Sequence, residues 1–153
     1  MRFWRIAQRK YALDRACLGT SMYGGRWNPI GMPALYCGST IAISSLEKFV
    51  HIASGALPPQ VLVAIDVPDD CALFEPDISA LPMGWDAMPT STSAQAFGGQ
   101  WLSGLTHVGM RVPSAIVNEE TNIVLNPQHP EFARVSLTEI RPFTFDPRMY
   151  KTP

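Results

Sequence analysis

The sequence predicts an α+β fold in a single compact domain. Its 153 residues are an ordinary length for one domain. Several short apolar runs are separated by turn residues, and few segments show helical periodicity. Because strands and helices do not alternate regularly, a mixed β core with a few short helices is favoured over a repeated βαβ arrangement. We expect one domain over residues 1–153, without an internal repeat, a low-complexity segment or a linker.

The first part of the chain predicts short strands and turns. Residues 3–7 are expected to form the first strand, and a helical turn is expected around residues 13–17. Residues 24–28 and 34–37 are expected to pair as a hairpin, because Asn-Pro, Gly and Pro lie between them.

The clearest helical pattern covers residues 41–53. The apolar residues that recur there at helical spacing are Ile43, Leu46, Val50 and Ala53. Ser39 and Thr40 are good N-caps, and Gly55 together with the following prolines is expected to end the helix. Glu47 falls on the flank of the apolar face, a position that suits a carboxylate lining a cleft.

The rest of the chain predicts further strands, one loop-rich segment and a second helix. The expected strands cover residues 61–67, 69–74, 115–117, 122–125 and 137–145. Residues 75–90 contain the prolines and glycine of a loop. Residues 91–103 indicate a helix interrupted by two glycines.

Composition limits the class of protein. The net charge of −1 argues against a protein that binds nucleic acid directly. Apolar residues make up 46% and charged residues 16%, which indicates much buried surface, as in an oligomer or a permanent complex. Three cysteines without a Cys-x-x-Cys pair indicate neither a zinc site nor a disulfide framework, so a cytoplasmic location is expected. Neither a signal peptide nor a membrane span is expected.

Three residues of complementary chemistry follow one another at near-even spacing: Arg26, Tyr36 and Glu47. A turn rich in Gly and Pro separates the first two, and a helix start separates the second two. A cation, an aromatic ring and a carboxylate can therefore meet in one cleft. Such groups suit a substrate that carries an anion, a flat ring and a sugar that becomes cationic.

Taken singly, each of these residues also has an ordinary structural role. An Arg after two glycines is typical of a turn, a Tyr in a short strand is typical of a core, and a Glu beside a Lys is typical of a solvated helix face. His51 follows Glu47 by one helical turn and is expected to make a structural hydrogen bond rather than to act in catalysis. The other histidines lack ligand-like partners, so no metal site is expected.

Five phrases of the sequence, in order, resemble the RES domain family. They are Gly-Gly-Arg-Trp-Asn-Pro, Ala-Leu-Tyr-Cys-Gly-Ser, Leu-Glu-Lys-Phe-Val-His, Val-Pro-Ser-Ala-Ile-Val and Asn-Ile-Val-Leu-Asn-Pro-Gln-His-Pro. The match runs from Trp4 to about Phe145, which is nearly the whole chain. The resemblance implies a toxin of a bacterial RES–Xre toxin–antitoxin system, with a fold similar to that of ADP-ribosyltransferase toxins.

The resemblance also implies an activity and partners. RES toxins consume NAD as a substrate, by hydrolysis or phosphorolysis, and at least one branch ADP-ribosylates a protein instead. No cofactor is therefore expected. The implied partner is a helix-turn-helix Xre antitoxin that blocks the active site and represses the operon, so any contact with nucleic acid would be indirect. A homodimer within the antitoxin complex is also implied.

Residue by residue, the family motif falls on Arg26, Tyr36, Glu47 and Ser114. The resemblance implies that Glu47 stabilises the cationic ribose, Arg26 anchors a phosphate, Tyr36 stacks on nicotinamide and Ser114 orients the carboxylate. Arg5 is expected to make a second phosphate contact.

Two residues depart from the family pattern, and several functions stay open. Asn118 stands where many relatives have Pro, and Lys48 follows Glu47 where an apolar residue is common.

The favoured function is cleavage of the nicotinamide–ribose bond of NAD by a glycohydrolase or phosphorylase. The alternatives are an ADP-ribosyltransferase that modifies a cellular protein and a non-catalytic module that binds NAD or a partner. The acceptor, the oligomeric state, the way the antitoxin covers the site and a lid role for residues 75–90 stay open.

Overall fold

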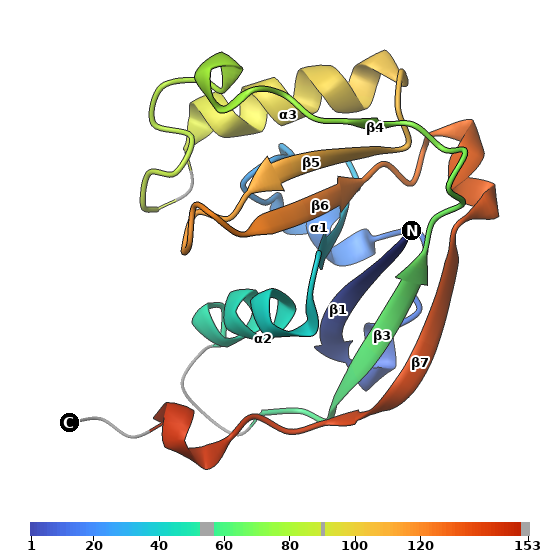
Figure 1. The fold of residues 1–153 in the computed structure, drawn as a ribbon, viewed down its shortest axis with the longest axis vertical. Helices are drawn as coiled ribbons and strands as arrows, with labels where there is room; N and C mark the ends of the chain where they lie inside the picture. The colour runs from blue at the N-terminus through green and yellow to red at the C-terminus, as the bar shows by residue number, and fades with distance from the viewer. Residues whose placement is uncertain (53–56, 90, 151–153) are drawn as a thin grey trace.

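Seven strands form one mixed sheet in the order β4-β5-β6-β2-β1-β3-β7 (Figure 1). The computed structural model describes residues 1–52, 57–89 and 91–150. Neighbouring strands pair antiparallel, except β4 and β5, which are parallel. The strands are β1 (Arg2–Gln8), β2 (Leu35–Gly38), β3 (Gln60–Asp66), β4 (Leu73–Phe74), β5 (Gly109–Pro113), β6 (Thr121–Leu125) and β7 (Ser136–Phe143). The expected α+β fold with a mixed sheet is confirmed.

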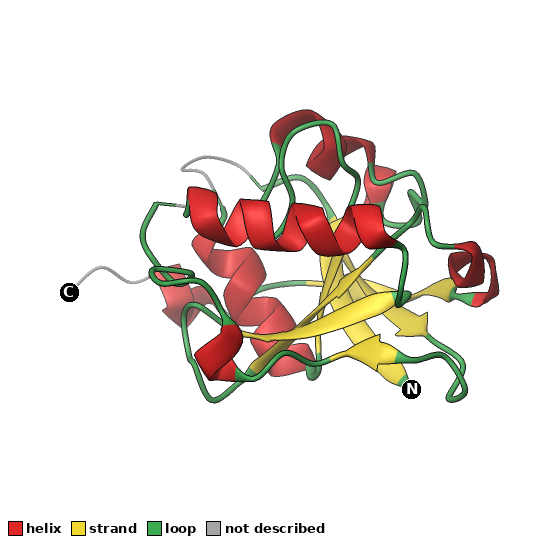
Figure 2. Ribbon diagram, turned by 90° about the horizontal axis from the view of Figure 1, so that it is seen from above, coloured by secondary structure: helices red, strands yellow, loops and turns green. Residues whose placement is uncertain are grey.

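Three α-helices accompany the sheet in the described part of the chain. They are α1 (Leu18–Tyr23), α2 (Ile41–Val50) and α3 (Thr92–Gly104). Short 3-10 turns cover Arg9–Tyr11, Ile78–Ala80, Pro130–Arg134 and Pro147–Tyr150. Seen from above, α3 lies across the sheet (Figure 2), and α2 lies beside β1 and β2. No described helix is both long enough and apolar enough to cross a membrane.

The sheet opens between β1 and β2. β2 pairs with β6 over four residues, from Leu35–Leu125 to Gly38–Asn122. It meets β1 only at the pair Trp4–Gly38. The half formed by β4, β5, β6 and β2 therefore separates from the half formed by β1, β3 and β7, as Figure 1 shows.

Each half has its own apolar packing. The cluster beneath α3 includes Trp27, Trp101, Met110 and Val124. The cluster beneath α2 is built on Ile6, Leu62 and Phe145, with Phe49 of α2 packed against it. The main cluster joins the halves through buried residues of β1, β2, β3 and β6, together with residues just after β3 and just before β5. They are Phe3, Ala7, Leu35, Cys37, Val61, Val63, Ile65, Val67, Val108, Ile123 and Leu125.

The predicted helix after residue 40 is confirmed, with an earlier end. The Thr40 side chain caps its start by accepting a hydrogen bond from the Ile43 N–H at 3.1 Å. The helix ends at Val50, where His51 takes the C-cap position and its Nδ1 bonds the Glu47 carbonyl at 2.7 Å. That bond satisfies one of the carbonyls that a helix end leaves free. Ala53 and Gly55, which the sequence assigned to the end of the helix, lie outside the described residues.

The expected hairpin of residues 24–28 and 34–37 is wrong. Residues 24–28 form a tight loop, closed by one bridge in which the Gly25 N–H donates to the Asn28 carbonyl at 2.9 Å. Gly24 has φ +70°, a conformation that favours glycine and turns the chain there. The returning strand is confirmed as β2, but it pairs with β6 and β1 instead.

Two further predictions misplace an element. The helical turn expected at 13–17 is displaced to α1, because the Asp14 carboxylate accepts hydrogen bonds from the Ala16 and Leu18 N–H groups and caps the following turn. The strand expected at 115–117 is a turn, and strand β5 before it was not predicted.

The remaining elements mostly agree with the sequence. The first strand, the strand after residue 60, β6 and α3 are confirmed, and of the strand expected at 69–74 only Leu73–Phe74 is present. Residues 75–89 are a loop with one 3-10 turn, and Thr90 lies outside the described residues. The last strand is confirmed as β7 and accommodates Pro142, because β7 is at the edge of the sheet and its outer side needs no donor.

Replacing Gly98 with Ala should destabilise the fold by about 3 kcal/mol, since overfilling a packed contact forces the backbone to move. A Cβ at Gly98 would lie 1.9 Å from the Trp27 carbonyl oxygen, so α3 would have to shift from the loop that carries Arg26. Gly104→Ala is the matched control, because a Cβ there would meet only the Thr106 side chain, at 3.9 Å. Urea denaturation followed by circular dichroism measures both, and equal free energies of unfolding would contradict this packing.

Candidate active site

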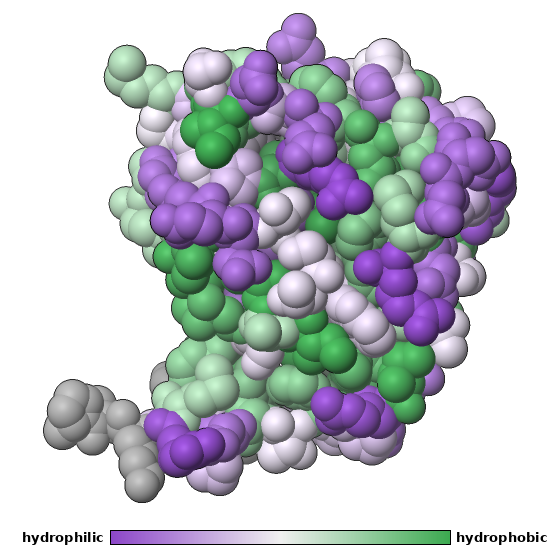
Figure 3. All heavy atoms as spheres, in the orientation of Figure 1, coloured by the Kyte–Doolittle hydropathy of each residue, from purple (hydrophilic) through white to green (hydrophobic). Residues whose placement is uncertain are grey.

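A cleft of about 600 Å³ lies where the two halves of the sheet separate. Its walls come from β1, the loop before β2, β2 itself, α2, and residues at the ends of β5 and β6, with Met88 and Pro89 at one side. On the face shown in Figure 3, hydrophobic residues are broken into separate patches by hydrophilic ones. The lining of the cleft includes apolar residues such as Trp4, Ile6 and Val50 and polar ones such as Arg5 and Asn122, a mixture typical of small-molecule sites.

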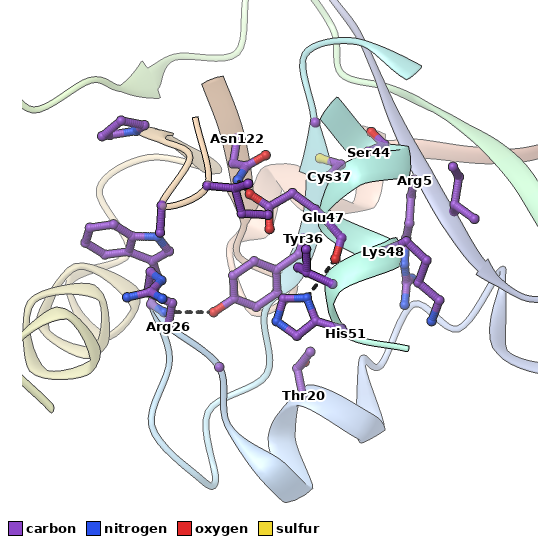
Figure 4. Close-up of a pocket in the computed structure, with 18 of the residues that line it drawn as sticks. Arg5, Thr20, Arg26, Tyr36, Cys37, Ser44, Glu47, Lys48, His51 and Asn122 are labelled. Atoms are coloured by element: carbon purple, nitrogen blue, oxygen red, sulfur yellow. Dashed lines mark hydrogen bonds between the residues drawn. The ribbon is translucent and has the colours of Figure 1, made fainter. Parts of the chain in front are cut away.

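Glu47 projects from α2 into this cleft and is held through one oxygen (Figure 4). Its Oε1 accepts hydrogen bonds from Ser114 Oγ at 2.8 Å and from Asn122 Nδ2. Within the described residues, Oε2 accepts none, so it is the oxygen that a ligand can reach. These two bonds fix the orientation of the carboxylate from the opposite half of the sheet.

Ser114 directs its proton to Glu47. The side chain is fully buried behind the carboxylate, and its Oγ also accepts hydrogen bonds from the N–H groups of Ile116 at 3.0 Å and Val117 at 3.3 Å. A serine hydroxyl has a single proton to donate. Because both backbone groups donate to the oxygen, that proton is left for Glu47 Oε1.

Tyr36 reaches the cleft from β2 and is anchored by its hydroxyl. The hydroxyl accepts from the Trp27 N–H at 2.9 Å and donates to Asn28 Oδ1 at 2.6 Å. Burial raises the pKa of Tyr36 well above its usual range, so the phenol stays neutral. A Cβ at Gly25 would lie 2.7 Å from this hydroxyl, which explains why glycine stands before Arg26.

Arg26 lies at one side of the cleft and donates hydrogen bonds to the loop of residues 75–89. Its Nη1 donates to the carbonyls of Trp85 at 2.7 Å and Ala87 at 3.0 Å. The neighbouring Trp27 ring stacks on the Trp85 ring, with centroids 6.0 Å apart. Nη2 approaches Met88 Sδ at 3.5 Å, so a phosphate could still bind through the N–H groups that the two carbonyls leave free.

The structure brings the predicted residues together. Arg5, Arg26, Tyr36 and Glu47 line the cleft, and Ser114 bonds Glu47 from behind. His51 also lines the cleft, but its ring bonds the Glu47 carbonyl and not the carboxylate, so the expected structural bond is confirmed.

Sequence reasoning missed Asn122. It is the second residue of β6, where it pairs with Gly38 of β2, and it donates the second hydrogen bond to the Glu47 carboxylate. The available signal was an amide side chain in an otherwise apolar strand, inside one of the phrases that resembles the family.

Cys37 lies in the cleft as a buried free thiol. Burial raises the pKa of Cys37 to about 12, so the thiol is protonated and a poor nucleophile at neutral pH. Within residues 1–52, 57–89 and 91–150, no three His, Cys, Asp or Glu side chains are grouped so as to hold a metal ion.

The sequence profile of the RES domain matches residues 2–146. The chain belongs to the RES domain family. A "Prs ADP-ribosylating toxin" of Sphingobium sp. is 40% identical over 97% of this chain and 96% of the relative. A protein named "Toxin Res" of Photorhabdus laumondii is 36% identical over 99% of this chain and 98% of the relative. The recognition of this RES domain as a toxin, made from its motifs, is confirmed.

A solved structure supports the same fold. A chain in the crystal structure of the M. tuberculosis MbcT–MbcA toxin–antitoxin complex superposes with a TM-score of 0.71. The superposition covers 92% of this RES domain and 84% of that chain, at 19% sequence identity. At that identity, the similarity establishes the fold.

Tyr36→Phe should cost about 2 kcal/mol of stability, because it leaves a buried donor and a buried acceptor without partners. Those groups are the Trp27 N–H and the Asn28 Oδ1. Tyr23→Phe, at an exposed tyrosine of α1, makes the same chemical change and should alter stability by less than about 0.5 kcal/mol. Thermal unfolding of both variants measures the difference, and matching midpoints would contradict the structural role of the Tyr36 hydroxyl.

Proposed function

We propose that this RES toxin cleaves the nicotinamide–ribose bond of NAD. The observation that carries the proposal is the Glu47 carboxylate, with Oε1 fixed by Ser114 and Asn122 and Oε2 open to a cleft of about 600 Å³. A carboxylate held in this way stabilises positive charge without having to reorganise during the reaction. The cleft volume suits a ligand of dinucleotide size.

The bond that breaks joins the ribose anomeric carbon to the nicotinamide nitrogen. Its electron pair leaves with the nitrogen, which neutralises the charge of the pyridinium ring. Positive charge then develops on the ribose, as in the oxocarbenium-like transition state of glycoside cleavage. Glu47 stabilises that charge through its free oxygen. Because the leaving group is already cationic, it departs as a neutral molecule and no strong general acid is needed.

The other cleft residues hold the substrate. The Tyr36 ring stacks on nicotinamide. The hydrogen bonds of the Tyr36 hydroxyl fix the plane of the tyrosine ring. Arg5 and Arg26 bind phosphate oxygens from two sides of the cleft. Ser114 keeps Glu47 in its orientation, which makes it a positioning residue. An acceptor with a lone pair (water, phosphate or a protein side chain) adds to the ribose carbon and releases its proton.

A partner protein restrains this activity in our proposal. The relatives are named toxins, and the superposed chain comes from a toxin–antitoxin complex. We place this chain in the cytoplasm as the toxin of such a pair, as a homodimer within the complex. Its antitoxin is of the helix-turn-helix Xre type, and DNA is contacted only through the antitoxin.

An ADP-ribosyltransferase is the second candidate function. The Sphingobium relative, 40% identical, is named for ADP-ribosylation. The chemistry up to the ribosyl cation is the same, and the two candidates differ only in the acceptor. A non-catalytic binding module is the third candidate, and it predicts NAD binding without nicotinamide release.

Glu47→Gln should lower NAD consumption by about 100-fold or more while the protein stays folded, because the amide cannot stabilise the ribosyl cation. NAD loss and its products are measured by chromatography with purified protein. Glu119→Gln, at an exposed loop carboxylate, is the matched control and should leave the rate unchanged. Undiminished turnover by folded Glu47→Gln protein would remove Glu47 from the mechanism.

If a protein is the acceptor, label from the adenylate half of NAD should appear on a discrete protein band in cell lysate. The label should depend on Glu47, because transfer and hydrolysis share the bond-breaking step. Electrophoresis of lysate treated with wild type or Glu47→Gln measures the transfer. Free ADP-ribose without a labelled band would favour water, and ADP-ribose 1″-phosphate would favour phosphate as the acceptor.

A further inference from the structure

Two cationic side chains lie together at the end of the cleft away from Arg26. Figure 4 shows Arg5 and Lys48 side by side, with Glu47 between them and Arg26. We propose that Arg5 and Lys48 form a phosphate-binding subsite, in which Lys48 supplies a second positive charge. This inference deepens the proposed function, and only the choice of NAD as a competing ligand depends on it.

Arg5 is a buried cation with an unused donor. It lies on β1 opposite Val63 of β3, and its Nη1 is buried without a hydrogen-bond partner in the described structure. Burial lowers the pKa of Arg5, although arginine stays charged at any physiological pH. A buried charged donor left without a partner is costly, so a ligand that accepts from it gains that free energy on binding.

Lys48 adds a like charge next to Arg5. It follows Glu47 on α2 and is partly buried at the cleft wall. The two side chains lie side by side (Figure 4), and burial together with the positive charge of Arg5 lowers the pKa of Lys48. Neither side chain forms an ion pair with any described residue.

The nearby carboxylates are engaged elsewhere. Asp14, whose charge reaches Arg5, accepts hydrogen bonds from the backbone N–H groups of residues 16 and 18. The Oε1 of Glu47 is taken by two side chains of the opposite half of the sheet. Neither carboxylate therefore forms an ion pair with Arg5 or Lys48 in the described structure.

The thiols that surround Arg5 do not neutralise it either. Burial raises the pKa of Cys17 to about 11 and that of Cys37 to about 12. Both thiols are therefore protonated at neutral pH. Two cations that form no ion pair and line a cleft favour the binding of an anion.

Phosphate fits this pair better than a carboxylate does. A guanidinium binds two phosphate oxygens through its planar fork, and an ammonium binds a third as a point charge. The phosphate has two sources, the diphosphate of the dinucleotide and free inorganic phosphate. Glu47 lies between this subsite and Arg26, so either phosphate would lie beside the proposed catalytic carboxylate (Figure 4).

The test is a calorimetric titration of the full chain with pyrophosphate and with inorganic phosphate, at constant ionic strength and without NAD. Lys48→Met keeps the length of the stem and removes the charge, so it should weaken binding about tenfold or more, the loss expected for one charge-assisted hydrogen bond. Lys48→Arg should retain most of the affinity. Lys10→Met, at an exposed lysine away from the cleft, makes the same change in net charge and should bind like wild type.

The source of the phosphate follows from competition in Glu47→Gln protein, in which NAD should persist. Displacement of pyrophosphate by NAD assigns the subsite to the diphosphate, and inorganic phosphate binding alongside NAD assigns it to an acceptor. Equal affinities for Lys48→Met and Lys10→Met, both folded by circular dichroism, would overturn the subsite. Because the titrations contain no turnover, they would still support the subsite if NAD cleavage itself were not found.

Discussion

The single contact between β1 and β2 is the constraint on which the site depends. The two strands meet only at Trp4 and Gly38, so the sheet opens there and the two halves form the walls of a cleft. Gly38 is required at that point because a Cβ would lie 2.6 Å from both the Ile43 and Ser44 side chains. The first turn of α2 therefore packs directly on the end of β2, which places Glu47 over the opening.

Polar contacts across the opening fix the halves relative to one another. Glu47 belongs to α2, which packs on β1 and β2, while Ser114 and Asn122 belong to the β5–β6 side. Buried polar groups are tolerated where their hydrogen bonds are satisfied, and such networks specify one arrangement. The same contact thus aligns the carboxylate and limits how far the cleft can open.

The sequence predicted most elements but fewer of the pairings. Periodicity and capping residues identified β3, α2 and α3, because those signals are local to each segment. The pairing of β2 with β6 depends on residues far apart in sequence, and the turn chemistry of residues 24–33 suggested a hairpin instead. For the site, the motif identified Glu47 and Ser114, whereas the bond from Asn122 arises only when β6 lies beside β2.

Arg26, which belongs to the family motif, and Arg5, which does not, differ in how their guanidinium groups are bonded within the protein. Nη1 of Arg26 donates to the carbonyls of Trp85 and Ala87, so this motif residue already stabilises a loop beside the cleft. Arg5 lies outside the trio at near-even spacing, yet its Nη1 is buried and has no partner in the described structure. A ligand gains more free energy from a donor that is desolvated and unpaired than from one that must exchange an existing hydrogen bond. Arg5 Nη1 is therefore a donor that could bind an anion without displacing a contact within the protein.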